Sequence, residues 1–101
     1  MLRIYEVMLA ETREMRPVLA RIEYRDRELG RQMRRAIASV ILNLGEGMGS
    51  SGGHRRERYR SALGSAVETR SGLDAAVALG YIVPTENRLN LVIHTLRKLV
   101  G

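Results

Sequence analysis

Basic side chains cluster in the segment His54-Arg55-Arg56-Glu57-Arg58-Tyr59-Arg60, at the expected start of a helix. Positive charges in a first helical turn oppose the helix dipole, at a cost of roughly a few tenths of a kcal/mol each. Free backbone amides and guanidinium groups together form an anion site, and a phosphate of RNA or DNA is a reasonable occupant. The alternative is a solvated face that pairs with Glu57 or with an acid of a neighbouring subunit. The candidate nucleic-acid contacts here are Arg55, Arg56, Arg58 and Arg60.

A second basic cluster lies earlier in the chain and comprises Arg25, Arg27, Arg31 and Arg34. Asp26 and Glu28 neutralise part of its charge. Arg31 and Arg34 join the candidate contacts to nucleic acid.

A polar stripe follows one face of the same expected helix. Arg35, Ser39 and Asn43 recur every fourth residue, and Glu46 comes three residues later. A carboxylate at a helix C-terminus opposes the dipole, so Glu46 needs a compensating donor. Partly buried polar groups demand partners, and the next helix offers Ser65 and Glu68. These six residues predict a structural network that fixes helix register or a subunit contact; a ligand pocket is the alternative.

Catalysis and cofactors find little support in the sequence. The chain has no cysteine nucleophile, and His54 and His94 lie far apart without a Glu-x-x-His motif. Gly47-Met-Gly-Ser-Ser-Gly52 fits the dinucleotide fingerprint, but a helix precedes it where the fingerprint needs a strand. Met8 and His94 could in principle ligate a haem, although a lone histidine on an exposed helix is far commoner. We therefore expect no enzyme activity, no metal and no cofactor.

The overall charge favours anionic partners. The net charge is +6, and all but one of the 17 basic residues are arginines, whose planar forks match phosphate or carboxylate. The codon bias of a GC-rich genome would also explain this preference for arginine over lysine. The lack of cysteine and the charges of Arg3 and Glu6 near the start predict a cytoplasmic protein with no membrane span.

Apolar periodicity predicts four helices, over about residues 2–23, 26–46, 54–79 and 84–100. Pro17 should kink or split the first helix, and Asp26 is placed to cap the second. Five glycines between residues 45 and 53 should end the second helix, and Pro84 should begin the fourth. Gly64 and Gly72 predict close helix contacts in the third. The sequence thus predicts an all-α, antiparallel up-down-up-down four-helix bundle, with residues 1–101 in one domain.

Four motifs carry a resemblance to a known family: Gln32-Met-Arg-Arg-Ala36, Asn43-Leu-Gly-Glu-Gly47, Ala62-Leu-Gly-Ser-Ala66 followed by Glu68, and Gly80-Tyr-Ile82. Nearly the whole chain resembles the bacterial four-helix-bundle family first known from intervening sequences of large-subunit ribosomal RNA. That family includes the accessory variability protein of diversity-generating retroelements. The chain departs from its pattern at Gly45, where alanine is common, and at Arg16-Pro17.

The resemblance implies a ring-shaped homopentamer with a basic surface that binds RNA or DNA, and a reverse transcriptase as partner in the retroelement branch. We expect a non-enzymatic, oligomeric nucleic-acid-binding or adaptor protein that contacts phosphate with little sequence selectivity, because four tyrosines offer few stacking platforms. The alternative is a homo-oligomeric assembly scaffold with no nucleic-acid role.

Overall fold

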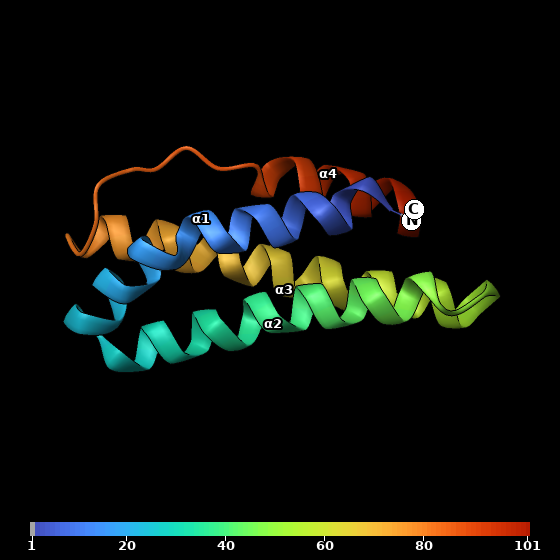
Figure 1. The fold of residues 1–101 in the computed structure, drawn as a ribbon, viewed down its shortest axis with the longest axis horizontal. Helices are drawn as coiled ribbons and strands as arrows, with labels where there is room; N and C mark the ends of the chain where they lie inside the picture. Colours follow the sequence, from blue (N-terminus) through green and yellow to red (C-terminus); the bar gives the residue numbers. More distant parts are fainter. Residues whose placement is uncertain (1) are drawn as a thin grey trace.

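The computed structural model describes residues 2–101 and contains four helices. Their bounds are α1 Arg3–Arg25, α2 Arg27–Met48, α3 Gly52–Ala78 and α4 Leu89–Val100. Within residues 2–101 there is no strand, which confirms the all-α prediction. Figure 1 shows that successive helices run in opposite directions, so the chain forms an up-down-up-down bundle. The bundle measures 42 × 22 × 21 Å.

The first helix runs unbroken through Pro17 and ends two residues later than predicted. The structure therefore excludes a split of α1 at the proline. Asp26 alone separates α1 from α2, and its Oδ1 accepts a hydrogen bond from the backbone N–H of Leu29 at 3.0 Å. The predicted N-cap is confirmed, because this contact satisfies one of the free amides at the start of α2.

The second helix ends at Met48, two residues later than predicted and inside the glycine-rich segment 45–53 that was expected to end it. Gly47 is buried, and a Cβ on it would overlap the ring of Tyr59 in α3. The close packing of this ring on the α2 backbone outweighs the low helix propensity of glycine.

The third helix begins at Gly52, two residues earlier than predicted, and is the longest of the four. Its two interior glycines differ. A Cβ on Gly72 would lie 2.7 Å from Cγ of Met33, so the predicted close contact with α2 is present there. Gly64 has no heavy atom near its missing Cβ, so the prediction of a close contact is wrong at this residue within the chain.

The fourth helix begins at Leu89, five residues later than the predicted start at Pro84. Gly80 ends α3 with a positive φ of 79°, and the chain then runs back along the bundle before α4 begins (Figure 1). Residues 83–88 are exposed, so this segment has no apolar side chain to hold a helical turn against the core. The helix starts at Leu89, which is buried. The backbone N–H of Leu89 donates a hydrogen bond to Oδ1 of Asn87 at 3.0 Å.

All four helices contribute to one hydrophobic core. Its fully buried members are mostly Met, Ile, Leu, Val and Ala, as the composition predicts. The most enclosed large side chains are Met8, Ile22, Met33, Val40, Leu44, Leu89, Val92, Ile93 and Leu96. This core fixes the positions of the polar and basic side chains on the helix surfaces.

Candidate nucleic-acid interface

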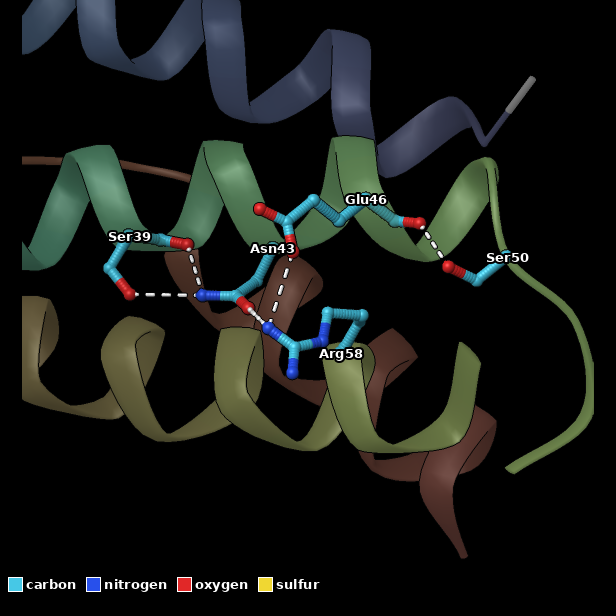
Figure 2. Close-up of polar contacts among 5 residues, drawn as sticks. All are labelled: Ser39, Asn43, Glu46, Ser50 and Arg58. Carbon is cyan, nitrogen blue, oxygen red and sulfur yellow. Dashed lines mark hydrogen bonds and ion pairs between the residues drawn. The ribbon is translucent and has the colours of Figure 1, made fainter. Parts of the chain in front are cut away.

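A hydrogen-bonded network joins α2 to α3 along one side of the bundle (Figure 2). Asn43 donates through Nδ2 to the backbone oxygen of Ser39 at 2.9 Å and to its Oγ at 3.1 Å. From α3, Ser65 donates through Oγ to Oγ of Ser39 at 2.7 Å. Arg58, also from α3, donates through Nη1 to Oδ1 of Asn43 at 3.4 Å and to Oε2 of Glu46 at 3.2 Å.

Arg58 is the compensating donor that Glu46 requires at the end of α2. Both side chains keep substantial exposure, so the ion pair itself contributes only about 0–1 kcal/mol. Its main effect is on register, since it fixes α3 relative to the last turns of α2. Arg58 is therefore engaged within the chain, although its sequence position suggested a contact to nucleic acid.

Arg35 and Glu68 complete the predicted polar stripe but stand apart from these bonds. Within residues 2–101 neither forms a hydrogen bond with the network. Both line a shallow cavity of about 320 Å³ between α2 and α3, together with Ser39 and Ser65. The hydrogen bonds thus join four of the six predicted residues and add Arg58.

At the start of α3, two of the remaining three candidate arginines have partners. Arg55 donates through Nε to the backbone oxygens of Gly47 at 3.2 Å and Ser50 at 2.9 Å, and so caps the C-terminal end of α2. Arg60 pairs with Glu57 at 3.1 Å. In the part of the chain that the structure describes, Arg56 has no hydrogen bond or ion pair. Arg56 is thus the arginine of this group whose fork is open to a ligand.

The corner where α1 turns into α2 lies at the left end of Figure 1. Near it, Arg27, Arg31 and Arg34 of the second basic cluster line a hollow, whereas Arg25 does not. We call this hollow the corner cavity. Its volume is about 540 Å³, and it is lined by Ala20, Glu23, Tyr24, Arg27, Arg31, Arg34 and Arg35. The four arginines lie at spacings of four, three and one residues, which places them on one broad face of α2. Both Arg31 and Arg34, predicted as contacts, are among the lining residues.

Charge in the corner cavity remains positive despite internal pairing. Arg34 holds Glu23 with two hydrogen bonds, Nε to Oε2 at 2.8 Å and Nη2 to Oε1 at 3.2 Å. These bonds lower the pKa of Glu23 and raise the pKa of Arg34, because they favour the charged form of each. Four lining arginines face one lining glutamate, which leaves a formal surplus of three positive charges.

The arginines of the corner cavity differ in how firmly they are held. Arg31 pairs with Glu28 at 3.7 Å, and both side chains are well exposed, so this contact is weak. Arg27 and Arg35 have no hydrogen bond or ion pair among residues 2–101. These two arginines can turn toward a bound anion without breaking a contact inside the chain.

Three contacts of Tyr81 at the same corner were not predicted from the sequence. The hydroxyl of Tyr81 donates to Oδ2 of Asp26 at 3.1 Å, and this bond raises the pKa of Tyr81. Arg25 lies over the Tyr81 ring at 5.4 Å from its centroid, and Arg21 donates through Nε to the Tyr81 backbone oxygen at 3.2 Å. Together these contacts hold the α3–α4 connector against the α1–α2 corner. The motif Gly80-Tyr-Ile82 was the signal in the sequence that could have pointed to it.

A second unpredicted contact ties α4 to α1. Arg88 donates through Nε to Oε1 of Glu11 at 2.9 Å. The Glu11 side chain is only 4% exposed, whereas that of Arg88 is 51% exposed. Glu11 is therefore a buried carboxylate that depends on one arginine at the surface.

No cluster of histidine and acidic side chains within residues 2–101 has a geometry suited to a metal ion. Met8 is fully buried, whereas His94 is exposed on α4, so the two do not face a common haem site. Along residues 2–101, no helix combines the length and apolar character needed to cross a membrane.

A family described as 23S rRNA-intervening sequence protein matches residues 3–101, which is nearly the whole chain. No curated protein and no solved structure matches the chain.

Proposed function

Because the chain belongs to the family of 23S rRNA-intervening sequence proteins, we propose that it is a non-enzymatic nucleic-acid-binding or adaptor protein that works as an oligomer. In this proposal, arginine side chains contact the phosphates of RNA or DNA. The resemblance supports a pentameric ring, with a reverse transcriptase as a further partner if the chain serves a retroelement. The lack of cysteine favours the cytoplasm.

The corner cavity is the observation that carries this proposal. Arginine forks bind phosphate oxygens in pairs, and the cavity gathers four of them with a positive surplus. Arg27 and Arg35 have no hydrogen bond or ion pair within residues 2–101. A contact between either side chain and a phosphate therefore breaks no existing ion pair.

The start of α3 supplies a second set of groups that can bind phosphate, at the opposite end of the bundle (Figure 1). Ser51 makes no side-chain cap there, so the first amides of α3 stay free beside Arg56. A strand that reached both basic regions would follow the long axis of 42 Å, or roughly a dozen phosphates at about 3.4 Å each.

Charge reversal tests the proposal. The variant Arg27→Glu/Arg35→Glu removes two cavity arginines that have no partner in residues 2–101. The control Arg97→Glu/Lys98→Glu changes the net charge equally on α4, and both of its side chains are exposed. Filter binding with RNA and DNA at about 150 mM salt should show a loss of about tenfold or more for the cavity variant and a smaller loss for the control. The proposal fails if both variants lose affinity equally, or if the wild type binds no better than an unrelated protein of equal charge.

Assembly without nucleic acid is the second candidate, and exposed apolar side chains on the helices favour it. Leu42 on α2 is 63% exposed, and Leu91 and Leu99 on α4 are also exposed. Solution mass by light scattering tests the oligomer, with Leu42→Glu as the disrupting variant. A wild-type monomer at micromolar concentration would contradict the oligomer, whereas a stable oligomer without affinity for nucleic acid would favour the scaffold.

A further inference from the structure

We propose that the corner cavity holds an unpaired nucleotide, with its base stacked on Tyr24 and its phosphates on the neighbouring arginines. The inference rests on the proposed function and extends it from general phosphate binding to a site for single-stranded RNA or DNA. The ligand chemistry is one flat base joined to anionic phosphate.

Tyr24 is the tyrosine whose ring is open to a ligand. Its exposed fraction is 89%. Tyr59 is buried against Gly47, and the Tyr81 ring is covered by Arg25 while its hydroxyl is bonded to Asp26. Tyr5 is partly buried and packs against the core. A single exposed aromatic residue is ordinary on a protein surface, so exposure by itself decides nothing.

The surroundings of Tyr24 are what point to a nucleotide. Tyr24 and Ala20 are one turn apart on α1, and both line the corner cavity, where alanine leaves room beside the ring. Arg27 and Arg31 line the same hollow from α2. A base has two apolar faces and a phosphate on either side, which match an open ring flanked by guanidinium forks.

The opposite end of the bundle lacks this combination. At the start of α3 the aromatic residue is Tyr59, which is 5% exposed and cannot receive a base. Phosphate contacts there do not distinguish single strands from duplexes. A base in a duplex is stacked on both faces and cannot lie on Tyr24, so the corner cavity should prefer unpaired nucleotides.

The test uses the full chain and three variants: Tyr24→Ala removes the ring, Tyr24→Phe keeps its face, and Val83→Ala trims another exposed apolar side chain. Affinity is measured by fluorescence anisotropy for single-stranded RNA and DNA of about 16 nucleotides and for the corresponding duplexes. Tyr24→Ala should weaken single-strand binding about tenfold and change duplex binding less than about twofold. Tyr24→Phe and Val83→Ala should bind like the wild type. Comparing the RNA and DNA arms identifies the preferred strand.

The outcomes separate this inference from the proposed function. If wild type binds strands and duplexes but Tyr24→Ala binds single strands equally well, the stacking site is wrong and the proposed function stands. If wild type binds no nucleic acid, both fail. If Tyr24→Ala changes the solution mass, the corner cavity is a subunit contact and the inference is overturned.

Discussion

Gly47 shows how a contact with another helix lets α2 continue two residues beyond its predicted end. Glycine propensity predicted that α2 would stop near residue 46, yet the helix continues to Met48. The missing side chain lets the Tyr59 ring lie directly on the α2 backbone. Propensity acts locally, whereas this contact joins residues in two helices, so the sequence pattern alone did not reveal it.

Substitution at Gly47 should therefore destabilise the fold. Gly47→Ala should lower the free energy of unfolding by about 1–3 kcal/mol, because the new Cβ overlaps the Tyr59 ring. Gly64→Ala is the matched control, since no atom lies within 4 Å of its Cβ position. It should raise stability by about 0.5–1 kcal/mol through helix propensity. Urea unfolding followed by circular dichroism measures both, and a Gly47→Ala protein as stable as wild type would refute the contact.

The helices themselves were largely predictable. Apolar periodicity gave the existence and type of all four, and Asp26 was recognisable as the cap of α2. The start of α4 was missed, because proline is permitted in a first turn but does not create one; burial of Leu89 decides where α4 begins. The polar stripe was visible at four-residue spacing, but its link to Arg58 was not, because Arg58 lies on α3 and its partners Asn43 and Glu46 lie on α2.

The contact between α1 and α4 lay beyond any local pattern, since Glu11 and Arg88 are far apart in the chain. Its strength can be measured. Arg88→Ala should lower the free energy of unfolding by about 1–3 kcal/mol, because Glu11 is left as a buried carboxylate without its donor.

Two further variants isolate this effect. Arg97→Ala removes an exposed arginine of α4 and should cost less than about 0.5 kcal/mol. Glu11→Leu in the Arg88→Ala background should recover stability, because an apolar side chain suits the buried position. Equal losses for Arg88→Ala and Arg97→Ala would show that the pair does not support α4.

The whole molecule places its basic regions at the two ends of an elongated bundle with a net charge of +6. Composition predicted the charge but not its distribution. Arg27 is close to Tyr24 in the sequence, but only the fold brings Arg35, about three helical turns further along the chain, to the same hollow as the Tyr24 ring. The fold also gives Arg55 and Arg58 hydrogen-bond partners within the chain. Within residues 2–101, Arg56, Arg27 and Arg35 have no hydrogen bond or ion pair.

The salt dependence of RNA binding tests the central claim, that arginines of this bundle bind phosphate. Affinity of the wild type for a single-stranded RNA should fall linearly in a double-logarithmic plot between about 50 and 200 mM salt. Four phosphate contacts per chain predict a slope of about −3, and Arg27→Glu/Arg35→Glu should make it shallower by about 1 or more. A wild-type affinity that does not change with salt, or a slope unchanged in the variant, would contradict the account.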